Sequence, residues 1–283
     1  MRSTMRTLTV AILLVSGMAA LGQWRGGWSR GDRSSARTAR EIPQHGMETP
    51  QWTNAPGFEG DVFSFARVRY TGGRGRGAGW HTDLPDAELN LSWRLQQITS
   101  MKVDPDGRIV ELTDPDLGDY PFLYIVEPGG LGLTEAEILG LRNHLLNGGF
   151  LMLDDFWGER EWQTCEEVMR RVLPQWSFVE LPLDHPLYSC LFRITAKGQV
   201  PHVEMGIESQ WSGGVTWERP DARVVHHRAI FDDRGRMLVI AFHNTDNGDG
   251  WEWDGTDNYF FRNFSEKIAY PLEINTLFYV MTH

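Results

Sequence analysis

Carboxylates follow the apolar runs of this sequence, and they are the groups best suited to chemistry. Asp154 and Asp155 come directly after the apolar run FLML, and Glu127 follows the run PFLYIV. Short continuous apolar runs are typical of strands that are covered on both faces. The carboxyl ends of parallel strands form the ligand-binding edge of such a sheet. The sequence therefore predicts a polar site at Glu127, Asp154 and Asp155, with Trp157 beside it as a binding residue.

Asp154 and Asp155 are catalytic candidates with an alternative structural role. Adjacent residues of an extended strand point to opposite faces, so a pair that shares a proton requires the chain to turn between them. One of them could instead cap the next helix, where a carboxylate meets free N–H groups. His185, which follows Asp184, is a third catalytic candidate because a carboxylate can orient a histidine. A hydrogen bond that fastens this loop is the simpler explanation.

The densest polar cluster is the run HNTDNGDGWEWD at 243–254. Asp246, Asp249 and Glu252 are hard oxygen donors separated by glycine or tryptophan, and such donors suit calcium or magnesium. The spacing does not match an EF-hand loop, and Asx turns explain much of the composition without a metal.

Aromatic residues in the same run are binding candidates. Trp251 and Trp253 have large apolar areas and could stack on a sugar or peptide, or plug the end of the sheet. His243 stands at the start of the run and is a further candidate for ligand binding.

The elements that position these residues alternate between strand and helix patterns. Thr134 and Glu137 form a capping box that marks a helix start, and Asp83 is predicted to cap an earlier helix. The order strand, helix, strand, helix, strand, helix predicts an α/β domain with a flavodoxin-like parallel sheet. Further strands are expected at 177–181, 191–194, 223–231 and 237–242, with a final helix at 271–281. They predict a β-rich C-terminal extension.

The first 22 residues have the layout of a secretory signal. Arg2 and Arg6 precede an apolar run, and small residues lead to Gly22. The run is too short for a comfortable membrane span, so cleavage and a periplasmic or extracellular location are predicted. An N-terminal anchor in the inner membrane is the alternative. Residues 23–58 lack an apolar period and are predicted to be a disordered linker, which leaves 59–283 as the folded domain.

The net charge bears on the kind of partner that the chain can bind, and the cysteine content bears on disulfide formation. The 283-residue chain has a formal net charge of −11, which disfavours nucleic acid as a partner. Removal of residues 1–22 removes two arginines and no acids, so the mature chain is near −13. The only cysteines are Cys165 and Cys190. They could pair in an oxidising compartment, but Cys165 falls on the apolar face of a helix, which favours free thiols.

Several motifs occur together in a recognisable order. They are YPFLYIVEPGG, LRNHLLNGGFLMLDDFWG, LPLDHPLY, AFHNTDNGDGWEW and the closing FYVMTH. In this respect the chain resembles a bacterial family catalogued as domain of unknown function 4159, over roughly residues 60–283. The resemblance implies a class I glutamine amidotransferase-like fold with a flavodoxin-like sheet. It does not imply a known activity.

An active glutamine amidotransferase needs a cysteine on the sharp turn after a central strand. On the alignment that the resemblance suggests, Asp154, Asp155 and Phe156 occupy that turn. The sequence therefore predicts a non-catalytic binding or scaffold domain of the cell envelope, whose partner is a small ligand or another envelope protein. The alternative is a carboxylate- or metal-dependent hydrolase that acts on carbohydrate or another envelope substrate. The hydrolase hypothesis requires Asp154 or Asp155 to share one cleft with His185 and the 243–254 run.

Overall fold

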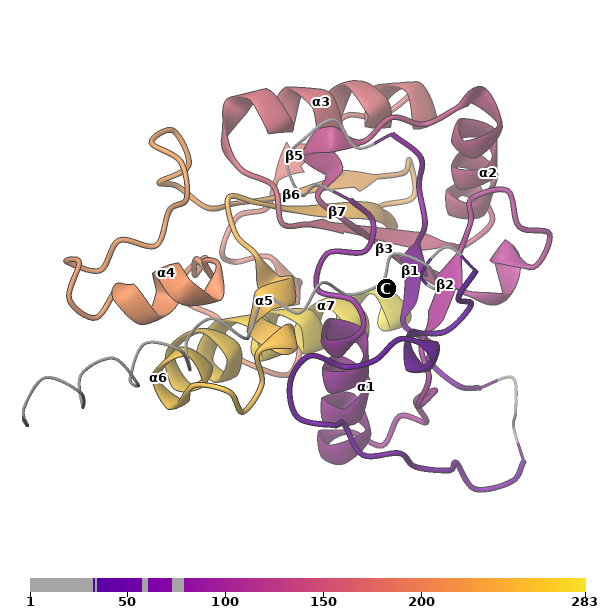
Figure 1. Ribbon diagram of the computed structural model, residues 1–283. Coiled ribbons are helices and arrows are strands. Elements are labelled where there is room, and N and C mark those ends of the chain that lie inside the picture. The colour runs from indigo at the N-terminus through magenta and orange to yellow at the C-terminus, as the bar shows by residue number, and fades with distance from the viewer. Residues whose placement is uncertain (1–32, 34, 58–60, 73–78) are drawn as a thin grey trace, which may run out of the picture. The chain divides into compact units, whose positions relative to one another are not determined.

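A seven-stranded sheet forms the centre of the domain, with the strand order β2-β1-β3-β4-β7-β6-β5 (Figure 1). The strands are β1 (Ala66–Val68), β2 (Arg108–Val110), β3 (Phe122–Val126), β4 (Phe150–Asp154), β5 (Val179–Glu180), β6 (His226–Phe231) and β7 (Met237–His243). The first five strands in this spatial order are parallel, and β6 and β5 are antiparallel additions at one edge. This computed structural model describes residues 33, 35–57, 61–72 and 79–283. The domain comprises Ala36–His283.

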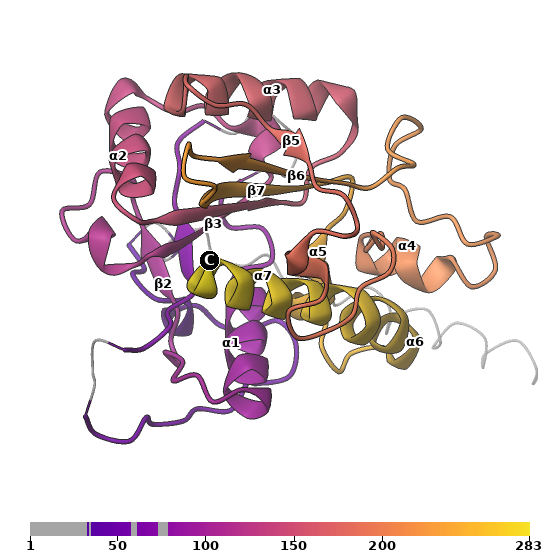
Figure 2. The same cartoon turned by 180° about the vertical axis from the view of Figure 1, so that it is seen from behind.

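Helices cover both faces of the sheet (Figures 1 and 2). On one face lie α2 (Glu135–Leu146) and α3 (Gly158–Val172), and on the other lie α1 (Asp86–Ile98) and α7 (Tyr270–Thr282). The shorter helices are α4 (Val203–Glu208), α5 (Asn247–Glu252), α6 (Asn258–Phe260) and a π-helix at Phe261–Ala269. Single 3-10 turns occur at Ala39–Glu41, Leu117–Asp119, Pro128–Gly130 and Pro186–Tyr188. None of the helices in the described ranges is both long and apolar enough to cross a membrane.

Alternation along β3 explains how one strand is buried on both sides. Phe122, Tyr124 and Val126 belong to the core beneath α1 and α7. Leu123 and Ile125 belong to the core beneath α2 and α3. Because successive side chains of a strand point to opposite faces, a continuous apolar run serves two cores at once. The prediction of an α/β domain with a mainly parallel sheet is confirmed.

The two predicted helix starts have different outcomes. Thr134 is the N-cap of α2, and its hydroxyl and the Glu137 carboxylate make the reciprocal bonds of a capping box, as predicted. Asp83 does not cap α1, so that prediction is wrong. The N-cap is Pro85, and Asp83 contributes its main-chain oxygen, which accepts a hydrogen bond from Ala87 N. The side chain of Asp83 is therefore available for another role.

The C-terminal half differs in part from the prediction of a β-rich extension. The hairpin of β6 and β7 forms, but β5, β6 and β7 extend the central sheet, and the chain beyond β7 is mostly helical. The strand predicted at 191–194 is absent. Its backbone pairs instead with one side chain, because Leu191 N and Phe192 N donate to Asn275 Oδ1 and Asn275 Nδ2 donates to Phe192 O. A side-chain amide therefore replaces a neighbouring strand.

The structure differs from the predicted linker over residues 36–57. Ala39 and Ile42 are buried, and Trp52 packs against Trp93 with 5.4 Å between ring centroids. Trp52 Nε1 also donates to Val103 O at 2.8 Å. These anchors are too sparse to form an apolar period, which is why the composition suggested disorder. The predicted signal at 1–22, residues 23–32 and 34, and residue 58 lie outside the described residues.

Gly140 lies where α2 touches the chain beyond β2, and it provides a test of this packing. A Cβ at Gly140 would lie 1.9 Å from Leu112 O. We expect Gly140→Ala to lower the free energy of unfolding by about 1–3 kcal/mol, although alanine is normally the better helix former. Urea denaturation measures the change. Gly118→Ala is the control because a Cβ there meets nothing within 4 Å, and a similar loss in both variants would contradict this account.

Candidate functional site

An acidic pocket of about 490 Å³ lies at the carboxyl edge of the parallel strands. Glu127 follows β3, Asp155 follows β4, and Asp246 lies three residues after β7. The loop that leads into α1 adds Asp83. All four line the same pocket, together with Asp249 of α5. Because these strands are neighbours in the sheet, residues far apart in sequence meet at one edge.

The backbone turns sharply at the end of each of three neighbouring strands. Glu127, Asp155 and Asn244 directly follow β3, β4 and β7 and have φ values of 50°, 55° and 64°. Asp83 has a φ of 63°. The left-handed conformation of a residue with a side chain is unfavourable by roughly 1–2 kcal/mol, and it concentrates at functional sites. At β4, this turn separates Asp155 from Asp154.

Asp154 and Asp155 therefore have different surroundings. Asp154 is buried beneath α5, where its carboxylate accepts from Asn247 Nδ2 at 2.8 Å, Gly248 N at 3.0 Å and Tyr124 Oη at 3.3 Å. Asp155 lines the pocket, and its Oδ1 accepts from Trp157 Nε1 at 2.9 Å. Neither caps α3, whose N-cap is Trp157 without a side-chain bond. Burial raises the pKa of Asp154 to about 7.

The centre of the pocket is a set of three buried aspartates, Asp83, Asp155 and Asp246. One carboxylate oxygen from each lies within 4.8 Å of the others. Burial raises the pKa of all three well above the usual value, and neighbouring carboxylates raise it further. Asp83 Oδ2 is buried, and no hydrogen-bond partner for it lies in the part of the chain that the structure describes. Three carboxylates this close repel one another unless protons or a cation neutralise them.

A second set of carboxylates, Asp83, Asp249 and Glu252, shares Asp83 with the first. Asp249 is fixed by two bonds: its amide donates to Asp246 Oδ1 at 2.8 Å, and its Oδ2 accepts from Val203 N at 2.6 Å. Burial is again the largest cause of the raised pKa of Asp249. The three residues predicted as metal ligands, Asp246, Asp249 and Glu252, thus all line the acidic pocket.

Glu127 faces this pocket from the end of β3. Its Oε1 accepts from Thr82 Oγ1 at 2.9 Å, and its Oε2 accepts from Gly79 N at 3.0 Å. Burial raises the pKa of Glu127 to about 7, although these two hydrogen bonds favour the ionised form. A carboxyl group that titrates near neutral pH can act as a general acid or base.

The predicted aromatic residues divide between the pocket and the core. Trp157 and Trp253 line the pocket. Trp251 is fully buried and contacts Phe65 and Tyr124, with 6.4 Å and 6.0 Å between ring centroids. Trp251 therefore plugs the end of the sheet and cannot stack on a ligand there.

The two histidines that sequence patterns singled out lie away from the pocket lining. His243 is buried, accepts from Arg228 through Nδ1 and donates through Nε2 to Gly158 O at 3.1 Å. Burial lowers the pKa of His243 to about 4, so the ring is neutral. His185 packs against Phe231 and Tyr279, and its Nδ1 accepts from Leu187 N. The carboxylates and the 243–254 run converge, but His185 does not join them.

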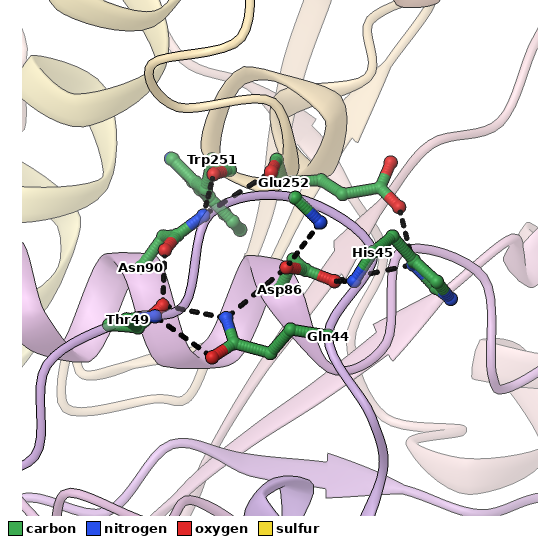
Figure 3. Close-up of polar contacts among 8 residues, drawn as sticks. Gln44, His45, Thr49, Asp86, Asn90, Trp251 and Glu252 are labelled. Atoms are coloured by element: carbon green, nitrogen blue, oxygen red, sulfur yellow. Dashed lines mark hydrogen bonds and ion pairs between the residues drawn. The ribbon is translucent and has the colours of Figure 1, made fainter.

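A segment of the predicted linker borders this site (Figure 3). The Asp86 carboxylate accepts from His45 N at 2.8 Å and from Gln44 Nε2 at 3.2 Å, which fastens the segment to α1. The His45 ring lies between two carboxylates, with Nδ1 3.2 Å from Asp86 Oδ2 and 3.5 Å from Glu252 Oε1. Hydrogen bonds to Asp86 and Glu252 raise the pKa of His45 to about 9. Glu252 thus connects this segment to the acidic pocket.

The pocket lining also contains Asp83, Glu161, His202 and Glu218, which no sequence pattern predicted as site residues. Asp83 precedes Leu84 and Pro85 at a predicted helix start, so the local sequence indicated a helix cap rather than a metal ligand. Glu218 Oε1 accepts from His202 N at 3.0 Å, which joins two loops whose positions no local pattern encodes. The two cysteines are free thiols outside the pocket lining, with Cys165 buried and Cys190 exposed.

Comparison with known families identifies the relationship. The model of the family described as Domain of unknown function (DUF4159) matches residues 64–281. The chain belongs to this family. The DUF4159 match includes every residue that lines the acidic pocket, from Thr82 to Trp253, but not the segment that carries His45. No match to this chain was found among curated proteins.

Proposed function

We propose that this chain is a non-catalytic binding domain of the bacterial envelope whose acidic pocket holds a divalent cation, calcium or magnesium. The observation that carries the proposal is the buried set Asp83, Asp155 and Asp246, whose oxygens lie within 4.8 Å of one another. Oxygens bound to one calcium ion at 2.3–2.6 Å can be up to about 5 Å apart. The three carboxylates could therefore bind one ion with little movement.

Charge supports the same proposal. Unpaired buried carboxylates are strongly destabilising, so the set must take up protons or a cation. Carboxylate oxygens are the ligands that calcium and magnesium prefer. A cation would also supply a partner for Asp83 Oδ2, which has none within the described ranges.

The pocket also has room for a small polar ligand beside the cation. Its volume of about 490 Å³ is within the range of small-molecule sites, and Trp157 and Trp253 supply apolar walls. A sugar or short peptide with oxygen atoms fits this chemistry. The envelope location rests on the signal-like layout of residues 1–22. The non-catalytic role rests on Asp154, Asp155 and Phe156, which occupy the turn after β4 where an amidotransferase has its nucleophilic cysteine.

We further propose a flavodoxin-like sheet of the class I glutamine amidotransferase-like kind. The parallel strands have the order β2-β1-β3-β4-β7, which corresponds to the flavodoxin-like order 2-1-3-4-5. The acidic pocket lies outside the carboxyl ends of these strands, where such folds bind ligands.

A metal-dependent hydrolase is the second candidate function. Glu127 favours it, since its carboxyl group faces the same pocket and has a pKa of about 7. Glu127 could then act as a general base toward a water molecule near the cation. His185 has no part in this version because it lies outside the pocket lining.

Cation binding should depend on pH in a defined direction. Burial raises the folded-state pKa of Asp83, Asp155 and Asp246, so protonation of these carboxyls stabilises the folded apoprotein. This contribution is fully present below the unfolded pKa near 4 and is lost as pH rises through the folded pKa. We expect the melting temperature of the apoprotein to fall between pH 6.5 and 8, because burial raises the pKa of Glu127 and of Asp154 to about 7. Over the same interval, calcium or magnesium should bind roughly tenfold more tightly or better, since fewer protons compete.

Isothermal titration calorimetry of the metal-free protein with calcium and with magnesium, at pH 6.5 and pH 8, measures this effect. Thermal unfolding at the same pH values gives the stability. The titration at pH 6.5 is the control for ions held loosely at exposed carboxylates, which are already ionised there. Absence of binding at both pH values would refute the proposed function.

A further inference from the structure

The acidic pocket contains two adjoining sets of carboxylates that share one residue. Asp83, Asp155 and Asp246 form the first set, and Asp83, Asp249 and Glu252 form the second. Within each set, one oxygen from every residue lies within 4.8 Å of the others. A carboxylate has two oxygens and can bind two ions at once. Asp83 is therefore positioned to bridge two cations.

The side chain of Asp83 provides an independent indication of a missing ligand. The residue is only 7% exposed, yet none of the described residues donates a hydrogen bond to its Oδ2. The chain makes room for this oxygen at Gly248, where an added Cβ would lie 2.2 Å from Oδ2. The backbone at 248 is itself held by Asp154, whose Oδ2 accepts from Gly248 N at 3.0 Å. A buried, unpaired oxygen in a shaped recess among carboxylates is suited to a cation.

We propose that the pocket holds a pair of divalent cations bridged by Asp83, one bound also by Asp155 and Asp246 and the other by Asp249 and Glu252. This inference rests on the proposed cation-binding function and adds a second ion to it. The two sets contain five carboxylates. When all are ionised, one divalent cation offsets two of the five charges and a second offsets four. Paired ions in proteins lie about 3.5–4 Å apart, a separation that one carboxylate can bridge.

Glu252 distinguishes the two positions. It belongs to the second set only, and its Oε1 also lies 3.5 Å from His45 Nδ1 (Figure 3). Asp246 belongs to the first of these two sets only. Substitution of either residue should therefore remove one cation and leave the other.

Manganese is the probe, because paired and isolated Mn²⁺ ions give different electron paramagnetic resonance spectra. We expect the metal-free protein at pH 8 to bind two Mn²⁺ ions per chain in equilibrium dialysis. The spectrum should be that of an exchange-coupled pair, with hyperfine lines spaced at half the interval of isolated ions. One bound ion with the spectrum of isolated Mn²⁺ would overturn the pair and leave the single-cation function intact. No bound ion would overturn both.

Three variants sharpen this test. Glu252→Gln and Asp246→Asn should each bind one Mn²⁺ and lose the coupled spectrum, while their thermal unfolding transitions remain cooperative. Glu266→Gln is the matched control because Glu266 is exposed and belongs to neither set, and it should retain the coupled pair. A coupled pair that persists in Glu252→Gln would overturn the assignment.

Discussion

Asp83→Asn is expected to abolish most cation binding and yet to stabilise the metal-free protein. Asp83 belongs to both carboxylate sets, so its loss removes a ligand from each. We expect calcium or magnesium affinity to fall by roughly 100-fold or more, which corresponds to about 2.7 kcal/mol. The metal-free variant should gain about 1–2 kcal/mol at pH 8, because a buried carboxylate has become a neutral amide. Calorimetry and urea denaturation measure the two effects.

Asparagine suits this position for two reasons. It has the shape of aspartate, and it tolerates the left-handed backbone that Asp83 adopts with a φ of 63°. Asp184→Asn is the control, since Asp184 is exposed and lies outside the pocket lining. That change should alter neither affinity nor stability measurably. If Asp83→Asn lost stability while cation affinity stayed the same, the carboxylate would have a purely structural role.

The second large effect is expected from Arg67, which supports the pocket from β1. Arg67 forms a fully buried ion pair with Glu88. Its Nη1 donates to Trp80 O at 3.0 Å and to Thr82 O at 2.6 Å, which fixes the loop that leads to Asp83. Arg67→Met leaves the Glu88 carboxylate buried without its cation. We expect a loss of about 3–5 kcal/mol in the free energy of unfolding, measured by urea denaturation.

A double-mutant cycle separates the ion pair from the loop contacts. Replacement of both partners, Arg67→Met with Glu88→Leu, should recover much of the lost stability because no buried charge then remains unpaired. Arg170→Met is the control, since the pair between Arg170 and Glu166 is exposed and should contribute less than about 1 kcal/mol. Equal losses in Arg67→Met and in the double variant would show that the buried charge is not the cause.

Local sequence patterns correctly predicted the strands and helices that are specified by residues close together in sequence. The run PFLYIV specified a strand buried on both faces, and the Thr134 and Glu137 capping box specified the start of α2. The prediction of a strand at 191–194 was wrong because the backbone of Phe192 is hydrogen-bonded to the side chain of Asn275, which is 83 residues away in sequence. The 36–57 segment differed from a linker because a few separate anchors, such as Trp52, dock it against residues from elsewhere in the chain.

The sequence by itself determined the alternation of strands and helices, and with it the sheet edge where Glu127 and Asp155 gather. It also identified the donors Asp246, Asp249 and Glu252, since these residue types and glycines are clustered in one run. Only the tertiary structure decided that Asp83 joins them, that Asp154 is buried beneath α5, and that His185 lies outside the pocket lining. Strand order and the left-handed turns after β3, β4 and β7 set these positions. The strand order and these turns depend on contacts between residues far apart in sequence, so local sequence patterns cannot predict them.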